Sequence, residues 1–223
     1  MSQYVKSYSY VSDRVAIMDL HIPNSNGSGC VKYRVVNAYG PTTPRASSCP
    51  ELLDEFYTAL DRAVDIPSRY ELIVLGDFNA KIGKLTHEEL QTEITRHVGR
   101  YGVGVRNSNG ERFMEFVVKQ DLFVCNTSFQ HLSKHITTRT GWVKDYSAPS
   151  GKVTKPVYTQ IDYILCRSRS KRILQDSRSY AGATLSSDHK IVLAKVDLGK
   201  PTLLHKSKPK RIHYNTSKLT ADS

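Results

Sequence analysis

The chain has 223 residues, of which 39% are hydrophobic and 24% charged, a composition ordinary for a globular protein with one sizeable core. Lys and Arg number 32 against 21 Asp and Glu, and the formal net charge of +11 favours polyanionic partners, because each neutralised phosphate releases condensed counterions. No stretch approaches the roughly 20 apolar residues of a membrane helix, so a membrane-spanning protein is excluded. A basic charge that serves only solubility is the alternative to a nucleic-acid partner.

The four cysteines show neither C-x-x-C spacing nor a histidine at zinc-finger distance. Cys125 and Cys166 lie in apolar runs, where a free thiol behaves as a small hydrophobic group. The N-terminus lacks a charged-then-apolar signal pattern. We therefore expect a soluble intracellular protein without disulfides, in a reducing compartment.

The first elements read as two strands and a helix. Residues 14–22 and 31–39 have strand composition, with the turn-rich residues 23–27 between them. Ser48 to Glu51 has capping-box spacing, with a proline at an early helical position. The apolar residues that follow at helical intervals are Leu53, Phe56, Tyr57, Leu60, Ala63 and Val64.

A short apolar strand over 71–75 then runs into Gly76-Asp77-Phe78-Asn79, and the polar, glycine-rich residues 84–109 are expected to be mostly loop. Ser108 and Glu111 repeat the capping-box spacing, which predicts a second helix with an apolar face. Further strands are expected over 122–125, 157–166 and 191–196. This order of elements predicts a mixed sheet with helices against it, in an α/β sandwich.

The composition changes from residue 199 onward, where six Lys or Arg face a single Asp with almost no apolar periodicity. We expect a folded domain over residues 1–198 and a basic tail or linker over residues 199–223. A solvated tail without a role, a nuclear-targeting patch and a phosphate-contacting arm all remain open for it.

Four short clusters stand at or near the ends of predicted strands, where rigid elements hold side chains that emerge on loops. Each carries a polar group that suits phosphodiester chemistry. The clusters are Asn37 to Pro41, Gly76 to Asn79, Gln160 to Tyr163 inside a strand, and Ser186 to His189.

Phosphodiester hydrolysis needs a cation to neutralise charge, a base to orient or deprotonate water, and donors for the transition state. Asp77, Asp162 and Asp188 supply carboxylates of the kind Mg²⁺ prefers. Asn79, Tyr39 and His189 supply donors or a base. The clusters together therefore hold the groups that the reaction requires.

Each residue also has a simpler interpretation. Asp and Asn in the second cluster are common turn formers, and Tyr39 taken alone is a core aromatic with a satisfied hydroxyl. Asp162 is harder to explain, because a carboxylate in an apolar strand costs several kcal/mol unless it is paired or metal-bound. His189 is its natural partner, since an Asp–His hydrogen bond fixes the imidazole tautomer.

The ordered set resembles the endonuclease/exonuclease/phosphatase superfamily, and within it the apurinic-like endonuclease domains of non-LTR retrotransposons and their craniofacial-development-protein-two-like relatives. The shared motifs are a tyrosine-x-proline strand end, Gly-Asp-Phe-Asn, Ile-Asp-Tyr and a final Ser-Asp-His. The segment from Tyr101 to Arg112, and Asn126-Thr127 followed by a stretch that ends at Trp142, are also typical of that subgroup. The resemblance covers residues 12–218.

The resemblance implies a four-layer α/β sandwich of the DNase-I-like type with the active site at one rim, and Mg²⁺ or Mn²⁺ as cofactor. Asp77 would orient or deprotonate the attacking water, and Asp188 with Asp77 would lie at the metal. Asn79 would bind the phosphate, and Asp162 would pair with His189. Tyr39 would contact the phosphate or assist the leaving oxygen. Arg45, six residues after Tyr39, and Trp142 would bind substrate, whereas Thr42 stands where these enzymes carry an asparagine.

Family members begin with a strand that carries an asparagine and a second that carries a metal-binding Glu, and no such motif precedes Tyr39. We therefore expect that the sandwich lacks its first strands and one metal ligand, as a gene-model fragment, a decayed transposon remnant or a domesticated protein. The expected function is a nuclear, DNA-cleaving endonuclease, with a reverse transcriptase following it in the parent element. A small-substrate phosphatase of the same fold and a non-catalytic nucleic-acid-binding relic are the alternatives.

Overall fold

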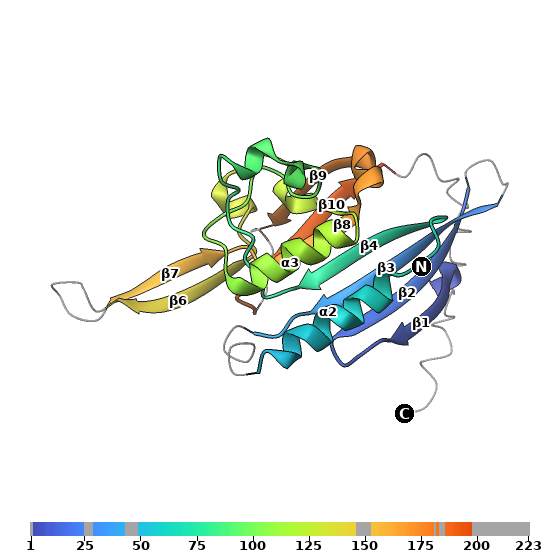
Figure 1. Ribbon diagram of the computed structural model, residues 1–223, viewed down its shortest axis with the longest axis horizontal. Coiled ribbons are helices and arrows are strands. Elements are labelled where there is room, and N and C mark those ends of the chain that lie inside the picture. Colours follow the sequence, from blue (N-terminus) through green and yellow to red (C-terminus); the bar gives the residue numbers. More distant parts are fainter. Residues whose placement is uncertain are drawn as a thin grey trace, which may run out of the picture.

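A six-stranded mixed sheet forms the centre of the protein, whose computed structural model describes residues 2–24, 29–42, 49–145, 153–180, 182 and 186–197. Its strand order is β1-β2-β3-β4-β8-β5, with β3 and β4 parallel and the other neighbouring pairs antiparallel (Figure 1). The strands are β1 (Val5–Tyr10), β2 (Val15–Pro23), β3 (Cys30–Tyr39), β4 (Tyr70–Asp77), β5 (Leu122–Val124) and β8 (Asp162–Arg167).

Two further strand pairs form separate two-stranded sheets. The hairpin of β6 (Arg139–Asp145) and β7 (Val153–Thr159) extends away from the body of the protein, at the left of Figure 1. The antiparallel pair of β9 (Leu174–Tyr180) and β10 (Ile191–Val196) packs against β8 and the 3₁₀ turn η4 (Cys125–Thr127). The other 3₁₀ turns are η1 (Ser2–Tyr4), η2 (Glu89–Gln91), η3 (Glu93–Arg96), η5 (Ser133–His135) and η6 (Ser168–Ile173).

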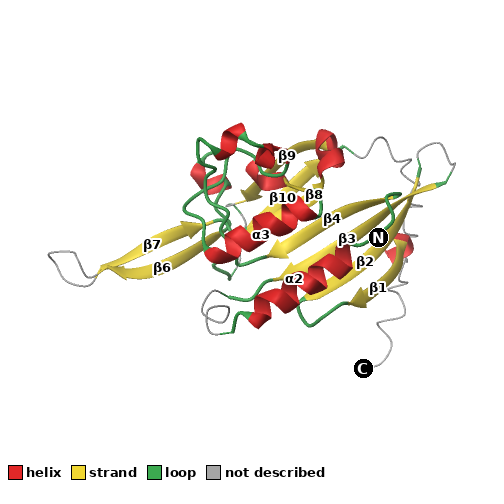
Figure 2. Ribbon diagram, in the orientation of Figure 1, coloured by secondary structure: helices red, strands yellow, loops and turns green. Residues whose placement is uncertain are grey.

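The two described α-helices, α2 (Glu51–Val64) and α3 (Ser108–Lys119), cover the same face of the six-stranded sheet (Figure 2). Their apolar sides and the sheet enclose one core, in which Leu60, Phe113 and Val74 are fully buried. Because α2 connects the parallel strands β3 and β4, it runs back along them, and both strands end at the same edge of the sheet. That edge carries the candidate site.

The strands predicted over 14–22, 31–39, 71–75, 122–125 and 191–196 are confirmed to within about two residues, as are the two helices. The single strand predicted over 157–166 is wrong. The chain breaks at Gln160 and Ile161, where β7 ends and β8 begins in another sheet. Asp162 is therefore the first residue of a strand and does not lie inside one.

Other details of the prediction also need correction. Strands β1, β6 and β9 were not predicted, because their sequences are too polar to show a clear strand pattern. These sequences are VKSYSY, RTGWVKD and LQDSRSY. Helix α3 is capped by Asn107, whose side chain accepts a hydrogen bond from the Gly110 amide, and not by Ser108. Pro50 precedes α2 without a side-chain cap.

Residues 25–27 of the predicted turn, Ser48 and the predicted basic tail over residues 199–223 lie outside the described residues. Among the helices that the structure does describe, none is long and apolar enough to cross a membrane.

Candidate active site

Three of the predicted site residues occupy one row across the sheet. Tyr39 at the end of β3 is the register partner of Asp77 at the end of β4, and Asp77 is the partner of Asp162 at the start of β8. Directly paired residues project from the same face of a sheet. The fold thus brings residues from three distant parts of the chain to one edge.

The Gly76–Asn79 turn is held in place by its apolar and its glycine residues. Phe78 is fully buried against Phe113 and Tyr163, which anchors the turn in the core. Gly76 has a φ of 147°, and a Cβ there would collide with the carbonyl oxygen of Ala38. Asn79 has a φ of 49°, in the left-handed region that asparagine tolerates better than most residues.

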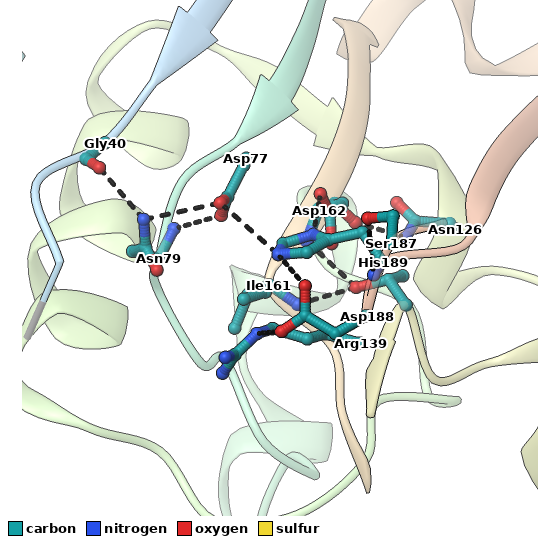
Figure 3. Close-up of polar contacts among 11 residues, drawn as sticks. Gly40, Asp77, Asn79, Asn126, Arg139, Ile161, Asp162, Ser187, Asp188 and His189 are labelled. Carbon is teal, nitrogen blue, oxygen red and sulfur yellow. Dashed lines mark hydrogen bonds and ion pairs between the residues drawn. The ribbon is translucent and has the colours of Figure 1, made fainter. Parts of the chain in front are cut away.

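The Asp77 side chain forms the turn and also faces the site. Its Oδ1 accepts a 2.9 Å hydrogen bond from the Asn79 backbone amide, as expected of a turn-forming aspartate. The Asn79 side-chain amide donates to the carbonyl oxygen of Gly40 at 2.9 Å and so ties the ends of β3 and β4 together. Asp77 Oδ2 accepts a 3.4 Å hydrogen bond from the same Asn79 side-chain amide and faces His189 Nε2 at 3.9 Å (Figure 3).

Asp162 and His189 form a hydrogen-bonded pair. His189 Nδ1 lies 3.0 Å from Asp162 Oδ1 and 3.1 Å from Oδ2. A carboxylate in this position keeps the proton on Nδ1, so that Nε2 is the nitrogen presented to the site. This Nε2 lies 3.9 Å from carboxylate oxygens of both Asp77 and Asp188, and the side chain of His189 is 30% exposed.

The electrostatic environment of this pair suits a cation. Burial raises the pKa of the Asp77 carboxyl, against the lowering effect of the Asn79 amide, and burial likewise raises the pKa of Asp162. Ligand atoms of Asp77, Asp162 and His189 all lie within 4.8 Å of one another. Two partly desolvated carboxylates and an imidazole fit a divalent cation, whose charge offsets the cost of keeping both carboxyl groups ionised.

Asp188 stands at the outer side of the site and is half-exposed. Its Oδ2 accepts a 2.8 Å hydrogen bond from Arg139 Nε, and it is not one of the three residues that form the candidate ligand group. Asp188 therefore lies beside the site with its carboxylate paired to an arginine.

The remaining predicted residues lie further out. Tyr39 is 52% exposed, so the alternative interpretation of it as a core aromatic is wrong. The guanidinium of Arg14 lies over its ring, 5.6 Å from the centroid. Trp142 is 67% exposed on β6, in the extending hairpin. Arg45 lies outside the described residues.

Three residues that support the site were not predicted. The Thr138 hydroxyl, fully buried, accepts hydrogen bonds from the amides of Ile161 and Asp162 at 3.0 and 3.1 Å. The Asn126 side chain donates to the carbonyl oxygen of Asp162 at 3.0 Å. Arg139 pairs with Asp188. Only Asn126 had a sequence signal, as part of the Asn126-Thr127 motif.

The segment from Tyr101 to Arg112 turns out to support the Gly76–Asn79 turn. Asn109 is buried, its side-chain amide donates to the carbonyl oxygen of Phe78 at 2.9 Å, and its Oδ1 accepts from the Tyr57 hydroxyl at 2.8 Å. Asn107 accepts a 2.9 Å hydrogen bond from the Lys81 amide. This motif stabilises the loop that follows the turn.

The sequence matches two craniofacial development proteins. It is 32% identical over 179 residues, 80% of the chain, to craniofacial development protein 2 of Bos taurus, and 33% identical over 144 residues to that of Tragulus javanicus. The chain spans about a quarter of the length of these relatives, 27% and 22% respectively. No protein-family model matches the chain.

The fold matches solved nuclease structures. The endonuclease domain of TRAS1, a telomere-specific non-LTR retrotransposon, superposes with a TM-score of 0.51 at 14% identity, over 87% of this chain and 70% of that one. The 3'-5' exonuclease NExo of Neisseria meningitidis superposes with a TM-score of 0.51 at 18% identity, over 86% of this chain and 71% of that one. These likenesses show the fold.

Proposed function

We propose that this chain is a metal-dependent phosphodiesterase that cleaves nucleic acid. It has the fold of the endonuclease/exonuclease/phosphatase superfamily, and it is homologous over 179 residues to craniofacial development protein 2. The observation that carries the proposal is the convergence of Asp77, Asp162 and His189 at one edge of the sheet. An Asp–His pair beside a second desolvated carboxylate provides a base and a cation site within reach of one phosphate.

The roles of the side chains follow from their contacts. Asp162 holds the imidazole through Nδ1, and His189 Nε2 contacts the scissile phosphate or takes a proton from water. Asp77 orients the attacking water, and Asn79, fixed between Asp77 and Gly40, binds the phosphate. Tyr39, exposed at the end of β3, contacts the phosphate or assists the leaving oxygen.

We assign Mg²⁺ or Mn²⁺ to the carboxylates of the site, with Asp77 as a ligand and Asp188 as a second one. The cation neutralises phosphate charge and polarises its oxygens when bound. Two carboxylates with water completing the shell match the preference of Mg²⁺ for a few oxygen ligands. Asp188 would exchange its present partner, Arg139, for the cation.

A nucleic-acid substrate is supported by the net charge of +11 and by the extending hairpin. Trp142, exposed on this hairpin, is proposed to stack on a base. Arg45 is proposed from the sequence resemblance alone to contact the phosphate backbone. The basic residues 199–223 are proposed as a separate tail that directs the chain to the nucleus. Removing them from a fluorescent fusion of the chain should abolish nuclear accumulation.

We further propose that the parent was a retrotransposon endonuclease followed by a reverse transcriptase. The complete fold would then be the four-layer sandwich, whose first strands and additional acidic ligand come from residues outside this sequence. The support for further strands is that the chain covers 70% and 71% of the two nuclease domains it matches, so part of each domain has no counterpart here. Fusing residues encoded upstream to this chain should strengthen Mg²⁺ binding.

Nicking of supercoiled plasmid in the presence of Mg²⁺ tests the proposed activity. Asp77→Asn removes the charge with little change in shape and should abolish nicking. Asp65→Asn makes the same chemical change at the exposed end of α2 away from the site and should leave nicking unchanged.

Other outcomes would favour the alternatives. Salt-sensitive DNA binding without nicking, in both this chain and its upstream-extended form, would point to a non-catalytic binding protein. Phosphate release from an inositol phosphate without nicking would point to a small-substrate phosphatase.

A further inference from the structure

The first residue of β6, Arg139, is fixed by its backbone against the segment just before β10, which carries His189. The two residues form an isolated antiparallel β-bridge. On either side of it, the Thr140 amide donates to the carbonyl oxygen of Asp188 at 2.8 Å, and the Lys190 amide donates to that of Thr138 at 2.7 Å. The Cα of Arg139 is therefore held in register with the Asp162–His189 pair.

The side chain of Arg139 turns into the site from this position, as Figure 3 shows. Its Nε donates to Asp188 Oδ2 at 2.8 Å. Burial raises the pKa of both Asp77 and Asp162, and the charge of Arg139 opposes that rise. Within the described ranges, no protein acceptor is recorded for its two Nη groups, and the side chain is 40% exposed. One N–H of five is thus used and a planar fork of donors remains.

The charge balance of the site shows what this fork would bind. Three carboxylates converge here, and a phosphodiester adds further negative charge. The neighbouring cation Lys190 is committed elsewhere, since its Nζ donates to the carbonyl oxygen of Lys134 and to Thr137 Oγ1. Arg14 lies over Tyr39, at the other side of the row.

From this geometry, which rests on the proposed function, we infer that Arg139 is a substrate-binding residue whose guanidinium binds a nonbridging oxygen of the scissile phosphate. Guanidinium and phosphate match as a bidentate pair, and Arg is suited to it where Lys acts only as a point charge. The competing explanation is structural, with Arg139 serving only to hold Asp188.

DNA binding measured without divalent cation separates these explanations. Fluorescence anisotropy of a short labelled duplex in EDTA, titrated with KCl, gives the slope of log K against log salt. Arg139→Gln should reduce this slope by about 0.9, the value for one phosphate contact on B-DNA. Arg62→Gln, the matched control, removes the same charge from the exposed last turn of α2 and should leave the slope unchanged.

Arg139→Lys keeps the positive charge but removes the planar set of guanidinium N–H donors. We expect it to retain the slope and the melting temperature but to lower kcat for plasmid nicking by at least tenfold, with a smaller change in KM. Equal slopes for Arg139→Gln and Arg62→Gln would overturn the inference. If Arg139→Gln does not fold, the Arg139→Lys variant decides. The inference would be overturned if that variant has the kcat and the DNA affinity of the wild type.

The two proposals fail separately. A wild-type chain that binds DNA but does not nick it would refute the proposed cleavage and leave the salt-slope comparison to decide the role of Arg139.

Discussion

Replacing Thr138 by valine should destabilise the fold through two backbone amides. The Thr138 hydroxyl accepts hydrogen bonds from Ile161 and Asp162, and valine keeps the shape of the side chain but removes this acceptor. A buried amide left without a partner costs about 1–3 kcal/mol, so the two together should lower the free energy of unfolding by about 2–6 kcal/mol. Burial raises the pKa of Asp162, the Thr138 hydroxyl opposes that rise, and this opposing effect would be lost.

Urea denaturation followed by circular dichroism measures this change. Thr138→Ser is the matched control, because it retains the oxygen and loses only a methyl group, which costs about 1 kcal/mol. If the valine variant is as stable as the serine variant, Thr138 does not hold the start of β8 by hydrogen bonding, and the reasoning is refuted.

Three further predictions concern the acidic site and the hairpin. The raised pKa values of Asp77 and Asp162 mean that, in EDTA, the folded state binds protons more tightly than the unfolded state. The free energy of unfolding should therefore fall as pH rises from the ordinary aspartate range through these raised values. Urea titrations at a series of pH values measure this dependence, and Asp77→Asn should make it flatter. At neutral pH, Mg²⁺ at a hundredfold excess over its Kd should raise the free energy of unfolding by about 2.7 kcal/mol, and Asp77→Asn should remove most of this increase; equal stabilisation of both proteins would argue against the assigned cation site. Trp142→Ala should weaken single-stranded DNA binding by about 1–3 kcal/mol in anisotropy titrations without changing the melting temperature, whereas Val143→Ala, at the next exposed position of β6, should leave binding unchanged.

The sequence by itself determined the local parts of the site. The apolar run of β4 followed by Gly76 and Asn79 predicts a strand and a turn, because glycine and asparagine tolerate positive φ values there. The apolar spacing from Leu53 to Val64 predicts the helix that covers the sheet. The chemical types of Asp162 and His189 suggested their pairing, since a carboxylate among apolar residues requires a partner.

Only the tertiary structure decided which residues meet. Strand β8 pairs with β4 and places Asp162 beside Asp77, and the same break in the chain at Gln160 turns β7 out into the hairpin. Arg139 and Asp188 are 49 positions apart, and nothing in their local sequence indicates that they form an ion pair. Helical and strand periodicity reports which face of an element is buried, whereas the partner of each strand is chosen by the packing of the whole sheet. Asp77, Asp162 and His189 were therefore recognisable as reactive groups from the sequence, while the support from Thr138 and the charge from Arg139 depend on long-range strand pairing.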